Sequence, residues 1–318
     1  MESLVRPACP FYAARMGATL NIERLDRDFG AIIHDVDVRT IDDDVFAAIH
    51  DTWIAYGVII LPGQFLTQDE QNAFALRFGD LEFPAAAISN LDKNGNIRHL
   101  SDDEVVKQIR GNEGWHHDST YMPVQAKGAV VTADIVTDTG AATGFADMRA
   151  AYDRLDEATK QRLEGLQAYH SLWFSMDRVG YLPSKRDENG VPVGYGYHGG
   201  ENPLRPLVKV HPETGRKNLN IGRHAHNIVG WDPEESQEFI DRINADAVWE
   251  ENTYFHQWAL GDAVVWDNRR MMHRATPFDF TQPRRIWHTR IAGDPTTESA
   301  LNAGIAARPA DQPAFRQD

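Results

Sequence analysis

The sequence predicts a mainly β fold, a barrel or jelly roll with flanking helices, and three observations support this prediction. Short segments rich in β-branched residues recur along the chain, above all after Gly128. Residues typical of turns separate these segments, as expected for many short strands. Only a few segments show the three- to four-residue apolar spacing of a helix. No linker divides the chain, so we expect a single domain.

The first part of the chain alternates between strand and helix signals. Residues 20–38 favour strands, because apolar and polar residues alternate there. Residues 42–56 predict a helix, whose acidic first turn suits the helix dipole. Residues 58–61 form a short β-branched segment that a Pro-Gly pair ends. This segment is therefore expected to be a strand.

Two local signals mark the elements that follow. Thr67 and Glu70 fit a capping box at the start of a helix, which we expect to stop near Gly79. The dipeptide Asn94-Gly95 predicts a hairpin within residues 88–97.

Strand signals dominate the rest of the chain. We expect strands at 129–136, 207–210, 218–221, 263–266 and 284–291, helices at 151–166 and 233–246, and a Gly/Tyr-rich loop at 190–200.

Composition limits the classes of partner. The chain has 318 residues and a formal net charge of −15. Its lysines and arginines are scattered, so we expect no nucleic acid and no anionic membrane as partner. The apolar runs are far shorter than the ~20 residues of a membrane span, and residues 1–10 lack the apolar core of a secretory signal. The single cysteine, Cys9, excludes an intramolecular disulfide and any site built from two cysteines. We therefore expect a cytoplasmic protein.

The first candidate for chemistry is the tripeptide His116-His117-Asp118. On an extended strand, residues two apart point to the same face. His116 and Asp118 are therefore expected to project together, and His117 is expected to point away. An imidazole and a carboxylate on one side of a strand can occupy two adjacent positions on one metal ion.

A third ligand must come from elsewhere, and His273 is the candidate. It follows the strand predicted at 263–266 and is expected in a tight loop. Two histidines and one carboxylate on one side of a metal form the facial triad of non-haem Fe(II) oxygenases. Such a triad leaves three positions for a bidentate co-substrate and O₂. The same three residue types also suit catalytic zinc, and the residues alone leave this choice open.

Arginines follow His273 on the strand predicted at 284–291. Arg284 and Arg290 share a face of that strand. The rigid fork of a guanidinium can bind both oxygens of a carboxylate. If the co-substrate is a keto-diacid, one end chelates iron and the far carboxylate needs such a partner. The neighbour Arg285 leaves the assignment open among the three arginines.

Six segments in this order resemble the taurine/2,4-dichlorophenoxyacetate dioxygenase family. They are LPGQ at 61–64, WHHDSTY at 115–121, TGFADMRAAYDRLDEATK at 143–160, HPETGRKNLNIGRHAH at 211–226, GDAVVWDNRRMMHRA at 261–275 and PRRIWHTRIAGD at 283–294. The pieces GRHAH and PRRIWHTR are most similar to the branch of bacterial aryloxyalkanoate dioxygenases that cleave (S)-2-phenoxypropionates.

The resemblance implies a fold and a domain boundary. Members of this family fold as a double-stranded β-helix, a cupin-like jelly roll. The likeness covers residues 17–294 as one Fe(II)/2-oxoglutarate dioxygenase domain. We expect an N-terminal extension at 1–16 and a C-terminal tail at 295–318. Because the family often forms dimers or larger assemblies, we also expect a homo-oligomer.

The resemblance also implies residue roles. It makes His116, Asp118 and His273 the Fe(II) ligands. Thr143 matches a threonine whose hydroxyl contacts 2-oxoglutarate. Arg284 matches the arginine that binds the distal carboxylate of 2-oxoglutarate.

One position departs from the family pattern. Many members carry a second arginine four residues after the first, and here that place is His288. Arg290, two residues further on, is expected to take the role.

The implied reaction consumes 2-oxoglutarate and O₂ and hydroxylates a small carboxylate substrate. With an aryloxyalkanoate, hydroxylation next to the ether oxygen releases a phenol and a 2-oxo acid, beside succinate and CO₂. The substrate carboxylate needs a cation, for which Lys107, Arg110 and Arg223 are candidates. An aromatic pocket is expected from five residues. They are Tyr121, Trp173, Phe174, Tyr195 and Tyr197.

Three alternatives remain at this stage. The first is a 2-oxoglutarate dioxygenase of a sulfonate, an alkyl sulfate or another small acid. The second is a Zn²⁺-dependent hydrolase, which leaves Thr143 and Arg284 without a function. The third is a non-catalytic jelly-roll binding protein, which the complete set of metal ligands argues against.

Overall fold

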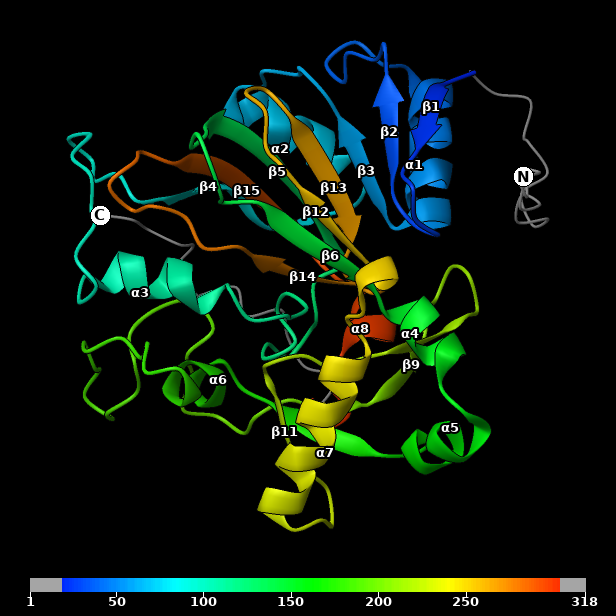
Figure 1. Cartoon of the computed structure of the whole chain (residues 1–318), viewed down its shortest axis with the longest axis vertical. Coiled ribbons are helices and arrows are strands. Elements are labelled where there is room, and N and C mark those ends of the chain that lie inside the picture. The colour runs from blue at the N-terminus through cyan, green and yellow to red at the C-terminus, as the bar shows by residue number, and fades with distance from the viewer. Residues whose placement is uncertain (1–18, 304–318) are drawn as a thin grey trace.

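Two β-sheets pack against each other through apolar side chains, and helices cover the outside (Figure 1). The structure is a computed structural model that describes residues 19–303. The chain is mainly β with flanking helices, as expected. None of the helices in the described part is both long and apolar enough to span a bilayer.

The larger sheet has seven strands in the order β1-β2-β3-β13-β5-β15-β4. Neighbouring strands are antiparallel, except for the parallel pair β2 and β3. The bounds are β1 Asn21–Arg24, β2 Ala31–His34, β3 Val58–Leu61, β13 Ala263–Asp267, β5 Gly128–Ile135, β15 Arg285–Ile291 and β4 Leu81–Ser89.

The smaller sheet has three antiparallel strands in the order β12-β6-β14, and it carries one wall of the functional site. These strands are β12 Thr253–His256, β6 Thr143–Asp147 and β14 Met271–Ala275. Two minor sheets complete the β-structure, with strands β7 Gln167–His170, β8 Leu204–Pro206, β9 Val208–Val210, β10 Lys217–Leu219 and β11 Ala225–Ile228.

The middle strands of the larger sheet are buried on both faces, which explains their continuous apolar sequences. In β13, Val265 faces a cluster formed with the helices, and Val264 and Trp266 face the smaller sheet. Phe145 of β6 meets Trp266 with ring centroids 5.7 Å apart. The two sheets therefore share one apolar core.

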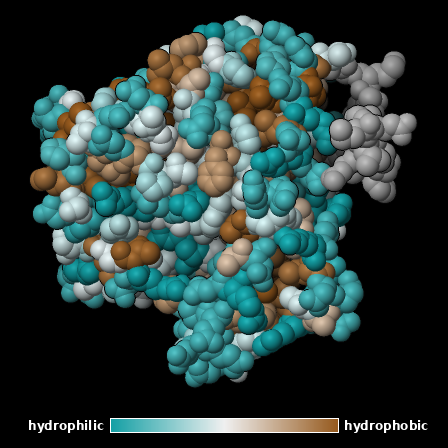
Figure 2. Space-filling view, in the orientation of Figure 1, coloured by the Kyte–Doolittle hydropathy of each residue, from teal (hydrophilic) through white to brown (hydrophobic). Residues whose placement is uncertain are grey.

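Helices pack on the outer face of the larger sheet and around the smaller ones (Figure 1). Ile49 and Trp53 of the first helix and Phe74 of the second are buried in the cluster that covers the larger sheet. The helices are α1 Asp43–Tyr56, α2 Gln68–Leu76, α3 Glu104–Gly111, α4 Met148–Arg154, α5 Glu157–Leu163, α6 Leu172–Arg178, α7 Pro233–Asp246 and α8 Pro295–Glu298, with a 3-10 turn at Glu250–Asn252. On the face shown in Figure 2, apolar side chains lie dispersed in small groups among polar ones.

Several predicted elements are confirmed with small shifts in their bounds. The helix 233–246 has the predicted bounds. Thr67 and Glu70 form the predicted capping box, although that helix ends at Leu76. The Asn94-Gly95 turn closes on a single bridge between Leu91 and Ile97 rather than on a full hairpin.

Two predictions about the chain's organisation are wrong. The helix expected at 151–166 is two helices, because Leu155 is extended and the carboxylate of Asp156 caps the second by accepting from the Thr159 amide at 2.8 Å. The expected tail at 295–318 contains a packed segment, because Glu298 is buried and forms an ion pair with Lys209. Residues 1–16 and the part of the tail after 303 lie outside the described residues.

Candidate functional site

His116, Asp118 and His273 form one buried cluster. One potential ligand atom from each residue lies within 4.8 Å of the other two. Asp118 Oδ1 is 4.0 Å from His116 Nε2, and Asp118 Oδ2 is 3.6 Å from His273 Nε2. Among the residues that the structure describes, this is the cluster of histidine, cysteine and carboxylate groups with the geometry to hold a metal ion.

A backbone bridge joins the two histidines, which are distant in the sequence. The amide of His116 donates to the carbonyl of His273, and the amide of His273 donates to the carbonyl of His116, both at 2.9 Å. His273 lies inside strand β14, so the prediction of a loop at this position is wrong. Its strand is set by pairing with β6, a strand that the sequence analysis missed.

The segment around Asp118 is not the extended strand that the sequence predicted. It forms the single bridge at His116 and then turns, and Ser119 adopts a φ of 55°. Asn268 holds the turn, because its side chain accepts from the Asp118 amide at 2.7 Å and donates to the Asp118 carbonyl at 2.9 Å. His117 points away from the cluster, as predicted, and its ring bonds to the Asn268 carbonyl at 2.7 Å.

The three side chains present free donor atoms to a metal. Nδ1 of His116 donates to the Gly114 carbonyl at 2.7 Å, which leaves Nε2 free to coordinate. Oδ2 of Asp118 is buried and has no hydrogen-bond partner within residues 19–303. Burial, then the neighbouring His273, lowers the pKa of His116 well below its ordinary value, and burial, then His288, does the same for His273. Neutral imidazoles beside a carboxylate fit a divalent cation.

Arg290 compensates the charge of Asp118. Its Nη2 donates to Asp118 Oδ1 at 2.6 Å, and its Nη1 donates to the Ser119 hydroxyl at 3.0 Å. Burial acts to raise the pKa of Asp118, but Arg290, followed by His288 and His116, holds it below the ordinary value. The Arg290 guanidinium is therefore already paired with Asp118, and this pairing competes with the predicted binding of the co-substrate by Arg290.

A polar chain continues from Ser119 to a loop over the cavity. The Ser119 hydroxyl contacts both oxygens of Glu82 at 3.0 Å, and the hydroxyl of Tyr195 donates to Glu82. Burial raises the pKa of Glu82. Tyr195 belongs to the predicted Gly/Tyr-rich loop, and its ring lies 5.5 Å from the guanidinium carbon of Arg290.

Arg284 is a buried guanidinium without an anionic partner among the described residues. It is 4 % exposed and contacts only the Ala141 carbonyl, at 3.4 Å, and the face of Phe278. Burial lowers its pKa to about 10. The guanidinium lines the same cavity as the metal-ligand cluster. A buried, unpaired cation of this kind suits a carboxylate ligand.

Arg285 points to the other side of the strand. It is half-exposed and forms an ion pair with Asp134 at 2.5 Å. Since neighbouring strand residues face opposite sides, the alternation of β15 directs Arg284, and not Arg285, to the cavity.

Thr143 lines the same cavity as Arg284, and Trp258 orients it. The indole Nε1 of Trp258 donates to Thr143 Oγ1 at 3.0 Å. An indole N–H can only donate, so the hydroxyl hydrogen of Thr143 remains free to donate to an anion. Sequence reasoning missed Trp258, because a lone tryptophan after β12 has no distinguishing motif.

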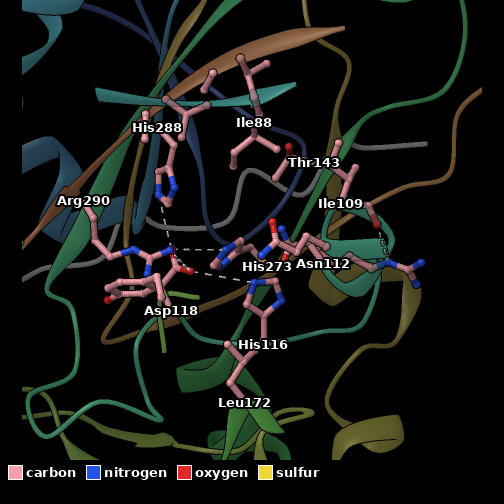
Figure 3. Close-up of a pocket in the computed structure, with 18 of the residues that line it drawn as sticks. Ile88, Ile109, Asn112, His116, Asp118, Thr143, Leu172, His273, His288 and Arg290 are labelled. Atoms are coloured by element: carbon pink, nitrogen blue, oxygen red, sulfur yellow. Dashed lines mark hydrogen bonds and ion pairs between the residues drawn. The ribbon is translucent and has the colours of Figure 1, made fainter. Parts of the chain in front are cut away.

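The cavity has a volume of about 160 Å³, and most of its lining surface is apolar. Figure 3 shows the polar end, where His116, His273, His288 and Arg290 surround Asp118. Apolar walls come from β4, α3 and α6. The sequence analysis missed both helices and all of β4 before residue 88. Their lining residues are Phe83, Ala86, Ala87, Ile88, Val105, Ile109, Leu172 and Met176.

The predicted aromatic pocket is confirmed in part. Tyr121, Tyr195 and Tyr197 line the cavity. Trp173 and Phe174 do not, because they lie on α6 and face a separate surface hollow, where Phe174 stacks on a neighbouring histidine. Of the residues of α6, Leu172–Arg178, only Leu172 and Met176 line the cavity.

The three candidate substrate cations differ in their surroundings. Lys107 forms an ion pair with Glu104 at 3.3 Å, and Arg110 lies over the ring of Phe280 at 5.1 Å. None of the three is itself a lining residue.

Arg223 lies directly behind the cavity wall, where its Nη2 donates to Ser175 at 3.3 Å and contacts the sulfur of Met176. Burial lowers the pKa of Arg223 to about 10. Within the described residues no carboxylate pairs with it.

Comparison with known proteins agrees with this geometry. The model of the taurine catabolism dioxygenase TauD, TfdA family matches residues 21–292. An (S)-phenoxypropionate/alpha-ketoglutarate-dioxygenase of Sphingobium herbicidovorans is 52% identical over 90% of this chain and 99% of the relative. A protein of the same name from Delftia acidovorans is 47% identical over 90% of this chain and 99% of its own length.

A solved structure, AAD-2 in complex with Mn(II) and N-oxalylglycine, superposes with a TM-score of 0.80. It is 33% identical and covers 90% of this chain and 100% of its own. A family match over most of the chain and relatives at this identity leave one assignment. The chain belongs to the TauD/TfdA family of dioxygenases.

Proposed function

We propose that this protein is an Fe(II)- and 2-oxoglutarate-dependent dioxygenase that cleaves aryloxyalkanoates, with (S)-phenoxypropionate-type acids as the favoured substrates. The observation that carries the proposal is one cavity holding both the His116-Asp118-His273 cluster and the unpaired guanidinium of Arg284. A set of three metal ligands alone fits many enzymes. The same three ligands in one cavity with a buried, unpaired guanidinium fit a co-substrate that chelates the metal at one end and carries a carboxylate at the other.

The relatives support the choice of substrate. The two at 52% and 47% identity are named for (S)-phenoxypropionate, and each aligns over almost its whole length. The packing of β12-β6-β14 against the seven-stranded sheet supports a double-stranded β-helix, the jelly roll expected for this family.

Each residue then has a defined task. Bound Fe(II), together with 2-oxoglutarate and O₂, supplies the oxidant that replaces a substrate hydrogen by a hydroxyl group. His116, Asp118 and His273 would hold the metal. Arg284 and the Thr143 hydroxyl bind the distal carboxylate of 2-oxoglutarate. The chain's contribution is placement, because the C–H bond held nearest to the metal is the one that reacts.

The substrate acid lies in the apolar half of the cavity. We propose that Arg223 receives its carboxylate and that α3, α6 and the tyrosines contain its aromatic ring. Arg223 contacts Ser175 and Met176 and does not itself line the cavity, so its contact with a substrate carboxylate requires these α6 side chains to move aside. Hydroxylation next to the ether oxygen gives a hemiketal, which collapses to a phenol and a 2-oxo acid.

The proposal includes the setting of the enzyme. We propose a cytoplasmic homo-oligomer whose partner is a small carboxylate, with neither nucleic acid nor membrane as a partner. The net charge of −15 supports the absence of polyanion binding. Size-exclusion chromatography with light scattering tests the oligomer.

A phenol-release screen tests the function. The protein is incubated with Fe(II), 2-oxoglutarate and O₂, and with phenoxyacetate or either enantiomer of 2-phenoxypropionate. We expect stoichiometric phenol, pyruvate and succinate from the (S)-propionate and none with D118A. Succinate release only with sulfonates or alkyl sulfates would show that these compounds, and not aryloxyalkanoates, are the substrates. Turnover with Zn²⁺ in the absence of O₂ would refute the dioxygenase.

A further inference from the structure

His288 is a buried polar group that the proposed function leaves without a task. It stands on β15 between Arg284 and Arg290 and is 6 % exposed. Its Nε2 has no hydrogen-bond partner among the described residues. A buried imidazole nitrogen with no partner is costly in a folded protein. The position therefore calls for a ligand group that completes it.

The Nε2 atom faces the metal-ligand cluster. It lies 3.6 Å from Oδ2 of Asp118, an oxygen that likewise has no hydrogen-bond partner in the described part of the chain. This separation is too long for a hydrogen bond. Figure 3 shows His288 pointing toward Asp118 from a different side than His116 and His273. His288 is not a member of the three-residue cluster, and it lines the same cavity as that cluster.

Aromatic rings fix the direction of the imidazole. Trp266 stacks on it with ring centroids 5.7 Å apart and an interplanar angle of 16°, and the edge of Phe83 meets it at 87°. Trp266 also contacts the His273 ring at 4.7 Å. The indole of Trp266 therefore contacts both His288 and the predicted metal ligand His273. His288 cannot swing into the position of a fourth ligand without losing this stack.

We assign the proton of the neutral ring to Nε2. A carboxylate is an acceptor only, so the tautomer with Nε2–H directed at Asp118 is electrostatically favoured. His288 therefore offers one unused N–H to any oxygen that enters the space beside Asp118.

The spacing along β15 identifies that oxygen. Arg284 and His288 are four residues apart on one face of the strand, about 13 Å at ~3.3 Å per residue. Both side chains line the same cavity. A five-carbon diacid with its distal carboxylate on the Arg284 guanidinium can therefore direct its other end toward His288.

We propose that the Nε2–H of His288 donates a hydrogen bond to the metal-chelating end of 2-oxoglutarate. This inference rests on the proposed function and extends it. His288 is a positioning residue that fixes which open positions the co-substrate occupies. Thr143 and Arg284 hold one end of the diacid, and His288 holds the other.

An anaerobic titration of the Fe(II) protein with 2-oxoglutarate tests the proposal, because bound co-substrate gives a visible charge-transfer band. In H288F, which keeps a stacked ring but removes the donor, we expect the dissociation constant of 2-oxoglutarate to rise about tenfold. The band should move to shorter wavelength, since a hydrogen bond to the chelating group stabilises its π* orbital. H288Q, which keeps an N–H, should approach the wild type in both values.

A matched control separates this effect from packing. His226 is also a buried histidine stacked on an aromatic ring, Phe174 at 4.5 Å, and it does not line the cavity. H226F should leave band and affinity unchanged. If H288F does not fold, H288L supplies the donor-free variant.

An unchanged band and affinity in the donor-free variant would overturn the inference. An equal loss in H288Q would also overturn it, because packing would then explain the effect. A wild type without any band would instead refute the proposed function.

Discussion

Arg290 donates to Asp118 across 2.6 Å, so the cluster's only carboxylate carries its counter-charge before any metal binds. Both side chains are buried. The pair explains how an anionic ligand can stay ionised inside an apolar cavity, and the first prediction follows from it.

Removing Arg290 should cost stability. R290M leaves a buried carboxylate without its partner, so we expect the free energy of unfolding of the metal-free protein to fall by about 3–5 kcal/mol. Urea unfolding at pH 7 measures this. Saturating Fe(II) should stabilise R290M more than the wild type, because the cation replaces the lost guanidinium. Equal metal stabilisation in both proteins would contradict this explanation.

The arginines of β15 should separate in co-substrate binding. R284M should raise the KM for 2-oxoglutarate about 100-fold, since a charge-assisted pair is lost, with a smaller change in kcat. R285A is the matched control, because Arg285 pairs with Asp134 at the half-exposed surface. Its KM should stay within about twofold of the wild type. Steady-state kinetics with varied 2-oxoglutarate measures both KM values. A larger increase in R285A than in R284M would assign the co-substrate carboxylate to Arg285.

Trp258 and Thr143 should act as one unit. W258F removes the indole donor and frees the Thr143 hydroxyl to rotate, so the KM for 2-oxoglutarate should rise about five- to tenfold. T143V should cost at least as much. In the double variant the second change should add almost nothing, because each variant breaks the same interaction. Fully additive effects in this double-mutant cycle would show that the 3.0 Å contact does not orient the hydroxyl.

Arg223 should govern the substrate and not the co-substrate. R223M should raise the KM for the aryloxypropionate about 100-fold and leave the dissociation constant of 2-oxoglutarate unchanged. K107A should have little effect on either constant, because the ammonium group is paired with Glu104. Phenol-release kinetics with varied substrate measure the first value, and the anaerobic titration measures the second. A loss confined to kcat in R223M would remove Arg223 from the substrate site.

Buried histidines should make the fold sensitive to acid. Burial, followed by the charge of Arg205, lowers the pKa of His170 well below 6.5. In the part of the chain that the structure describes, neither of its ring nitrogens has a hydrogen-bond partner. The unfolded chain takes up this proton as the pH falls through about 6.5 and the folded chain does not. The contribution of His170 to the free energy of unfolding is therefore fully present above that pH. Below it, the free energy of unfolding decreases by up to about 1.4 kcal/mol per pH unit for each such histidine.

The variant H170L should reduce this dependence. Unfolding measured from pH 8 to pH 5 should show a shallower loss below pH 6.5 in H170L than in the wild type. Parallel curves would mean that His170 is protonated in the folded state.

The sequence predicts the cluster better than the architecture around it. His116 and Asp118 are two residues apart, so local geometry suffices to place them together. The strand expected there is in fact a turn fixed by Asn268, a contact between segments that no local pattern reveals. The strand containing His273 was missed for a similar reason. Its partner β6 is short and fully buried, and such segments lack the alternation that marks a strand.

Charge pairing was the hardest feature to predict. The alternation of β15 correctly brings Arg284, His288 and Arg290 to one face. It does not show that Arg290 already forms an ion pair with Asp118. Nor does it show that Arg284 is buried without an anionic partner among the described residues. That distinction depends on a turn from another part of the chain. The same limit applies to Arg223, whose place behind Met176 depends on a helix that the sequence analysis missed.

The mutual backbone bridge between His116 and His273 separates two kinds of change in this protein. The metal side of the cavity is anchored by main-chain pairing, which most side-chain substitutions leave intact. The opposite side is built from α3, α6 and the 190–200 loop, which contribute side chains but no ligand of the cluster. Mutations there can change the substrate specificity while the metal ligands keep their positions. This division allows the substrate range to evolve without loss of the metal site.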